Sequence, residues 1–168
     1  MLVADAVNLA ALKLLEERGV PDALSMADLR KRLQDLTGRD LEYYVTPNLE
    51  GKEIHGVWGS DLAQNVDMVY LPPGPAGVQY FILQHEHGHM FVSPHGGKQD
   101  LGADPSVIDL LGSAIPLGRR LSFTFQHSDF SADEERLAEM VGAELAVRVL
   151  RYEKSRGKDF QFGRVFEG

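Results

Sequence analysis

The sequence predicts an α+β protein in which N-terminal helices, a short sheet and two further helices follow one another along the chain. Three observations lead to this fold class. Helical periodicity dominates the first 39 residues, runs of β-branched and aromatic residues follow, and two long helical segments come last. With 168 residues, of which 43% are hydrophobic, the chain can bury a sizeable core. We therefore expect one domain spanning residues 1–168.

Composition excludes several functional classes. The net charge of −8 argues against general binding to nucleic acid or to an anionic membrane surface, since both need basic side chains. The absence of cysteine excludes a disulfide framework and cysteine-ligated zinc. The N-terminus lacks a basic region, and no stretch is long and apolar enough to span a membrane. A cytoplasmic protein is the expectation.

Residues 1–39 are predicted to form a helical N-terminal part. Apolar spacing predicts a first helix over 3–18, and Ser25 and Gly38 are the expected caps of a second. Two short helices joined by a turn could read DNA, but the second carries few basic residues. We interpret the pair as scaffold.

The next region predicts an antiparallel sheet of about three strands. The three runs rich in β-forming residues are 41–46, 54–58 and 66–71. The sequence Pro-Pro-Gly-Pro at 72–75 ends the sheet and favours the start of a helix.

The helix predicted over 76–92 carries the pattern His-Glu-x-x-His, formed by His85, Glu86 and His89. Histidines four residues apart lie on one helical face and can bind one Zn²⁺ at about 2.0–2.1 Å. Glu86 lies about 100° round the helix, so it is better placed as a general base toward a metal-bound water than as a ligand. This segment therefore predicts a catalytic metal site.

The sequence of this helix supports three further predictions. Val78, Ile82 and Val92 share the stripe of the two ligand histidines, so we expect this stripe to be buried against a second helix. Gly88 costs about 0.5–1 kcal/mol in a helix interior, which indicates that another backbone or a substrate comes close. His87 points away from the stripe and is expected at the surface or behind the ligands.

A third ligand is expected on the last helix, which runs to about residue 156. Ser-Ala-Asp-Glu at 131–134 has the form of a capping box. Glu135 shares a face with Ala138 and Gly142, whose small size lets two helices approach at the short end of about 8–10 Å. Glu135 could then reach a metal held by the opposing helix, and Glu139 could accept a hydrogen bond from a ligand histidine.

Other residues compete for these roles. Glu134 is one residue away from Glu135, and His95 and His127 lie in 93–130, which we interpret as an insertion near the site. Either histidine could be an alternative ligand or an oxyanion helper. Tyr80 and Arg119 are further possible oxyanion donors.

Two segments together resemble the gluzincin pattern: His-Glu-x-x-His at 85–89 and Glu-x-x-Ala-Glu at 135–139. In that pattern, a downstream Glu-x-x-Ala-Asp helix gives the third zinc ligand and a supporting carboxylate. The small size, the order of elements and the His-Glu-x-Gly-His form with Gly88 resemble the ImmA/IrrE group of metallopeptidases. This resemblance covers residues 40–150.

The resemblance implies a minimal zincin-like fold in which the motif helix packs against the long C-terminal helix. It implies Zn²⁺ as cofactor, with His85, His89 and Glu135 as its ligands. Glu86 would be the general base, and Glu139 the supporting carboxylate. It also implies a cytoplasmic endopeptidase, whose protein partner could be a helix-turn-helix repressor in a stress, phage or mobile-element switch.

Three functional hypotheses follow. The first is a zinc endopeptidase acting on a protein partner, and the second is a regulatory or toxin-antitoxin-type binding protein with little proteolysis. The third is a structural metal domain with a fourth ligand from His95 or His127.

Two histidines and one carboxylate also suit Fe²⁺ or Mn²⁺. The tail 157–168 is expected to be an edge strand or a packed tail, with inhibition in the cleft as the alternative.

Overall fold

A computed structural model of the chain describes residues 3–52, 56–95, 111, 114, 123–125 and 131–157. The described elements confirm the α+β class, and the motif helix has the predicted bounds of 76–92. In chain order they are α1 (Val3–Glu17), α2 (Met26–Thr37), β1 (Asp40–Val45), the 3-10 helix η1 (Pro47–Leu49), β2 (Val57–Asp61), β3 (Val66–Leu71), α3 (Ala76–Val92), β4 (Phe123–Phe125) and α5 (Ala132–Ser155).

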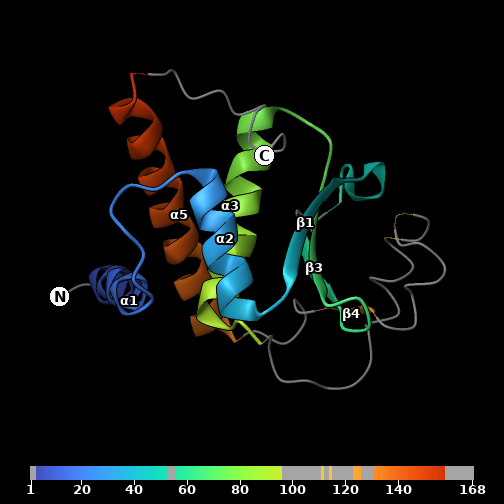
Figure 1. Cartoon of the computed structure of the whole chain (residues 1–168), viewed down its shortest axis with the longest axis horizontal. Helices are drawn as coiled ribbons and strands as arrows, with labels where there is room; N and C mark the ends of the chain where they lie inside the picture. Colours follow the sequence, from blue (N-terminus) through green and yellow to red (C-terminus); the bar gives the residue numbers. More distant parts are fainter. Residues whose placement is uncertain are drawn as a thin grey trace.

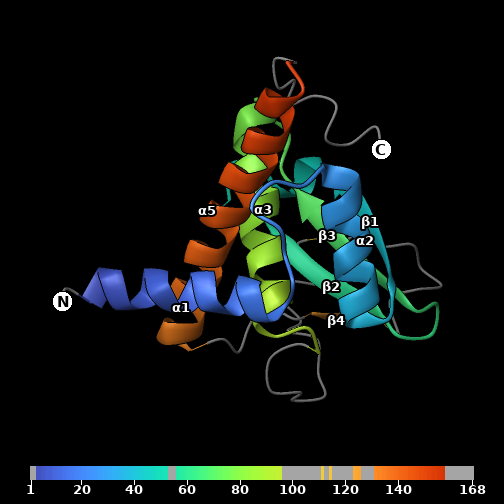
Figure 2. The same ribbon diagram turned by 60° about the vertical axis from the view of Figure 1, so that its left-hand side comes forward.

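Helix α3 occupies the middle of the molecule (Figure 1). It contacts β3 on one side and α5 on the other, while α2 contacts both α3 and β1. Helix α1 lies across α5 and contacts it (Figure 2), and its residues Ala11 and Leu15 are fully buried. The predicted packing of the motif helix against the long C-terminal helix is confirmed.

The sheet is mixed, with the strand order β1-β3-β2-β4. Strands β2 and β3 form an antiparallel hairpin, and β4 adds to β2 in antiparallel fashion. Strand β1 runs parallel to β3, which differs from the predicted antiparallel sheet. Strands that are consecutive in sequence are often, but not always, neighbours in space, and β1 joins the hairpin on its far side.

Strand β2 lies three residues further along the chain than the predicted strand at 54–58. Its second half, Gly-Ser-Asp, has the composition of a turn but is buried. Ser60 donates a hydrogen bond of 2.5 Å to Asp67 on β3, and Asp61 Oδ1 accepts from the backbone amides two and three residues on at 3.1 Å. These partners let polar residues continue the strand inside the protein.

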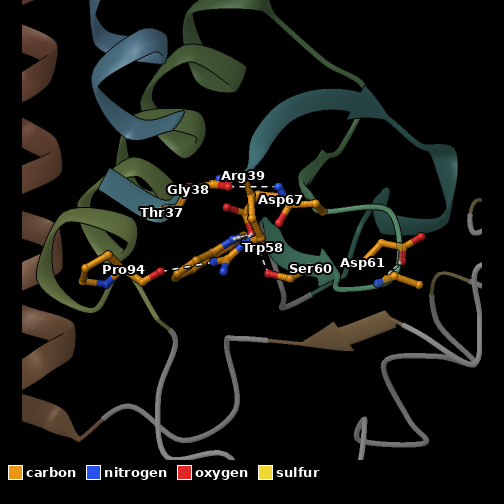
Figure 3. Close-up of polar contacts among 10 residues, drawn as sticks. Thr37, Gly38, Arg39, Trp58, Ser60, Asp61, Asp67 and Pro94 are labelled. Atoms are coloured by element: carbon orange, nitrogen blue, oxygen red, sulfur yellow. Dashed lines mark hydrogen bonds and ion pairs between the residues drawn. The ribbon is translucent and has the colours of Figure 1, made fainter. Parts of the chain in front are cut away.

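The carboxylate of Asp67 accepts hydrogen bonds from three side chains, one just before β1 and two on β2 (Figure 3). Its Oδ1 accepts from Arg39 Nε at 2.9 Å, from Trp58 Nε1 at 3.2 Å and from Ser60. Arg39 also donates to the carbonyl of Pro94, just after α3, at 3.2 Å. The sheet is thereby joined to the C-terminal end of the motif helix.

The caps of α2 are as predicted. Ser25 Oγ accepts from the backbone N–H of Asp28 at 3.0 Å, and Gly38 adopts the left-handed conformation with φ 73°. Arg30 and Arg32 on this helix donate to backbone carbonyls of neighbouring segments. Both guanidinium groups therefore serve packing contacts, in keeping with a scaffold.

Candidate metal centre

Helices α3 and α5 bring three predicted ligands together. The Nε2 atoms of His85 and His89 lie 3.1 Å apart. Glu135 Oε2 lies 3.3 Å from His89 Nε2 and 3.6 Å from His85 Nε2. Within the described part of the chain, these three residues alone form a group of three potential metal ligands with donor atoms within 4.8 Å of one another.

The spacing of these atoms fits a tetrahedral ion. Zinc bonds of about 2.0–2.1 Å at tetrahedral angles place neighbouring ligand atoms about 3.3 Å apart. The three separations, 3.1, 3.3 and 3.6 Å, lie around that value. Two imidazoles and one carboxylate also form the ligand set of catalytic zinc sites that keep a fourth position open. The residues present therefore satisfy the requirements of Zn²⁺, and their chemistry also suits Fe²⁺ or Mn²⁺.

Two glycines set the distance between the helices that carry the ligands. A β-carbon on Gly88 would lie 2.1 Å from the carbonyl oxygen of Ala138, and one on Gly142 would lie 2.5 Å from the carbonyl oxygen of Gln84. Any side chain at either position would push the two backbones apart. The predicted role of small residues at this crossing is confirmed.

The structure distinguishes Glu135 from its neighbour Glu134. Glu134 accepts the backbone N–H of Ser131 at 2.8 Å, and Ser131 Oγ accepts the backbone N–H of Glu134 at 3.2 Å. This is the predicted capping box, and it holds the Glu134 carboxylate at the start of α5. Glu135 is therefore the carboxylate that faces the two histidines.

Glu86 lies on the same helical turn as the ligands but is only 1% exposed. Burial raises the pKa of Glu86 to about 8, and the negative charge of Glu135 makes a second, smaller contribution in the same direction. Burial disfavours the ionised carboxylate, whereas a nearby cation favours it. The protonation state of this predicted base is therefore sensitive to a positive charge among the three ligands.

The stripe of α3 that carries the ligands is less buried than predicted. His89 is fully covered, but the side chain of His85 is 33% exposed. Further toward the start of the helix, Val78 is 54% and Phe81 55% exposed. Periodicity identifies a helical face, but it does not tell how far along the helix a neighbour covers that face. The exposed side of His85 thus continues into an apolar surface.

His87 is buried, so of the two positions predicted for it, at the surface or behind the ligands, the surface position is wrong. Its Nδ1 lies 3.1 Å from Gln84 Oε1, and its Nε2 lies 2.9 Å from the hydroxyl of Tyr43. Because an amide oxygen only accepts, we assign the proton to Nδ1, so that Nε2 accepts from Tyr43. Burial lowers the pKa of His87 to about 3, and the positive charge of Arg30 makes a second, smaller contribution in the same direction. A neutral His87 joins α3 to β1.

Tyr80 does not have the predicted role of an oxyanion donor. Its side chain is fully buried, and its hydroxyl donates to the carbonyl of Ala146 on α5 at 2.9 Å. The hydroxyl thus forms part of the contact between the two helices.

The remaining predicted residues lie apart from the cluster or outside the described residues. Glu139 is exposed and has no hydrogen bond to either ligand histidine in the described structure, so its supporting role stays a prediction. His95 is exposed and does not join the three ligands. His127 and Arg119 lie outside the described residues, as do most of the insertion 93–130 and the tail after 157.

Two neighbours of the site have no signal in the sequence. Tyr43 reaches His87 from β1, and Gly56, which precedes β2, lies directly against Glu86. Both contacts join residues about thirty or more positions apart, and only the pairing of the sheet with α3 creates them.

Comparisons with known proteins found no matching family model, no matching curated protein and no matching solved structure. Among the helices described, none has the length and apolar character needed to cross a membrane.

Proposed function

We propose that this protein is a zinc-dependent endopeptidase that hydrolyses a peptide bond in a protein partner. One observation carries the proposal: His85, His89 and Glu135 converge at separations suited to tetrahedral zinc. Glu86, on the same turn of α3, has the position that the zincin pattern gives to the general base.

Each residue has a distinct task in this proposal. The two histidines and Glu135 would hold the ion. When bound, Zn²⁺ supplies a Lewis acid that polarises a carbonyl group and lowers the pKa of water. Glu86, as a carboxylate, accepts a proton from the attacking water and returns it to the leaving amine.

The burial of Glu86 links its activity to the charge of the site. With a pKa of about 8 set by burial and by Glu135, the carboxyl is largely protonated at neutral pH and cannot act as a base. Positive charge between the histidines and Glu135 favours its ionised form. The base is therefore expected to be active in the metal-loaded protein.

The surface beside His85 supports a polypeptide substrate. Phe81 lies one helical turn before His85, and Val78 lies about one turn before Phe81. Both side chains are more than half exposed. Large exposed apolar side chains next to a reactive centre suit a partner that brings apolar side chains of its own.

The resemblance to the ImmA/IrrE group supports a finer proposal about the partner. We include in the proposal a helix-turn-helix repressor as substrate, cleaved in the cytoplasm as part of a stress, phage or mobile-element switch. The absence of cysteine is compatible with that compartment.

The decisive experiment removes the base and keeps the ligands. We expect Glu86→Gln to bind zinc at the wild-type stoichiometry and to lose cleavage of a co-expressed repressor, with fragments detected by mass spectrometry. Glu134→Gln is the matched control, because Glu134 serves the helix cap and a glutamine also completes a capping box. Cleavage retained by Glu86→Gln would refute the proposal.

A second candidate is a zincin-fold binding protein with little proteolytic activity. The burial of Glu86 together with the exposed Val78 and Phe81 favours it, because the apolar surface is more accessible than the base. It predicts a stable complex with the regulator and no fragments at any zinc loading. A structural metal site would instead have four protein ligands, which zinc X-ray absorption detects as a filled fourth position.

A further inference from the structure

Gly56, which precedes β2 of the sheet, lies against the side chain of Glu86 on α3. A β-carbon on Gly56 would be 2.8 Å from Glu86 Oε1 and 3.2 Å from Glu86 Cγ. It would also be 2.8 Å from Cγ2 of Ile82, one turn earlier on α3. Real β-carbons do not approach other heavy atoms below 3.0 Å, so an added methyl group must displace a neighbour.

Space, and not backbone conformation, requires glycine at this position. The glycines with positive φ in the described chain are Gly19, Gly38, Gly51, Gly74 and Gly157. Gly56 does not belong to this group, so other residues can adopt its backbone conformation. Its missing side chain is needed because the Glu86 carboxylate and the side chain of Ile82 occupy the adjoining volume.

The space open to the Glu86 side chain is therefore limited from the sheet. Gly56, the residue just before β2, lies against the Oε1 side of the carboxylate. A methyl group on Gly56 would move the Glu86 carboxylate or separate β2 from α3.

We propose that Gly56 is a positioning residue, which holds the Glu86 carboxylate in place by leaving room for it immediately before β2. The functional meaning of this position rests on the proposed peptidase activity. The contact itself is independent of any activity, and it can be tested in the metal-free protein.

The first test follows Glu86 directly by NMR. In ¹³C-labelled, metal-free protein, the side-chain carboxyl resonance of Glu86 is identified by its loss in Glu86→Gln. We expect this resonance to move in Gly56→Ala. It should stay in place in Gly51→Ala, a control that also precedes β2 but whose added β-carbon has no heavy atom within 4 Å. An unmoved Glu86 resonance in Gly56→Ala overturns the proposal.

A double-mutant cycle tests the same contact through stability. We expect Gly56→Ala to raise the unfolding equilibrium constant by about tenfold or more in the wild type. The rise should be smaller when Glu86→Ala has removed one of the two clashes, that with Glu86, and left that with Ile82. Equal effects in the two backgrounds would contradict a direct contact. If Gly56→Ala alone does not fold, the pair is compared in Ile82→Ala, where only the Glu86 contact remains.

The third measurement links the contact to function. In zinc-loaded protein we expect Gly56→Ala to keep the wild-type zinc content and to lower kcat by about ten- to a hundredfold, because small displacements of a catalytic group are costly. Gly51→Ala should keep wild-type kcat in its folded fraction. If the wild type cleaves nothing, the proposed function fails, whereas the NMR shift still decides the role of Gly56.

Discussion

Gly88 of α3 lies so close to Ala138 of α5 that a β-carbon on Gly88 would sit 2.1 Å from the Ala138 carbonyl oxygen. Gly88 comes three residues after His85, and Ala138 comes three residues after Glu135. This close approach of the two backbones therefore lies one turn after His85 on α3 and one turn after Glu135 on α5.

Gly88→Ala is expected to widen this crossing and weaken metal binding. Overpacking costs about 1–3 kcal/mol of stability, and a wider spacing moves Glu135 away from the histidines. We expect zinc affinity to fall by at least about tenfold in competition with a chromophoric chelator. Ala143→Val adds bulk to the exposed side of α5 and should keep wild-type affinity. Equal affinities for Gly88→Ala and the wild type would contradict the role of the crossing.

Glu135→Gln is expected to change zinc affinity, whereas Glu134→Ala is expected to change stability. Removing the Glu135 carboxylate takes away a proposed ligand, so zinc affinity should fall by at least about tenfold while the helix persists. Removing the Glu134 side chain breaks half of the capping box, so the free energy of unfolding should fall by about 1 kcal/mol with zinc content unchanged. Isothermal titration calorimetry and urea unfolding measure the two effects. Loss of metal in Glu134→Ala alone would reverse the assignment.

The buried His87 predicts a loss of stability in mild acid. Its pKa is about 3 in the folded protein, whereas the unfolded chain takes up a proton near its ordinary value of 6.5. The contribution of neutral His87 is therefore complete above pH 6.5 and is lost progressively as the pH falls toward 3.

At pH 5, linkage predicts a loss of about 2 kcal/mol from this one residue. Urea unfolding between pH 8 and pH 5, with EDTA present, should show a steeper decline for the wild type than for His87→Gln. Glutamine can still donate and accept hydrogen bonds but does not titrate. Parallel profiles for the two proteins would show that His87 is not the group responsible.

The ion pair of Arg39 and Asp67 is predicted to behave as a buried pair. Arg39→Met leaves a buried carboxylate without its cation and should cost about 3–5 kcal/mol in urea unfolding. Adding Asp67→Asn should restore part of that loss. Lys31→Met, which removes an exposed pair with Asp35, should cost less than about 1 kcal/mol. Similar losses for the buried and the exposed pair would contradict this view.

Local signals predicted the helix ends, because each capping residue forms its hydrogen bond with a residue three or four positions away. Ser25 accepts from the backbone N–H of Asp28, and the backbone N–H of Gly38 donates to the carbonyl of Gln34. At the start of α5, Ser131 and Glu134 bond to each other. The parallel pairing of β1 with β3 has no such local signal. It depends on which strand edge is free once the β2–β3 hairpin has formed.

The candidate site shows the same division. The spacing of His85 and His89 predicted a shared face, and Gly142 predicted the close crossing that brings Glu135 to them. Periodicity failed for His87, because α3 has neighbours on several sides and a residue that points away from α5 still meets β1. No feature of the sequence predicted the contact of Gly56 with Glu86.

The capping box at the start of α5 has a consequence for tolerance to insertions. Ser131 and Glu134 define where helical winding begins, and Glu135 follows at a set rotation from that point. One additional residue between this origin and Glu135 would turn its carboxylate by about 100° about the helix axis. Length variation in this protein should therefore be accepted before Ser131 and rejected in the four residues after it.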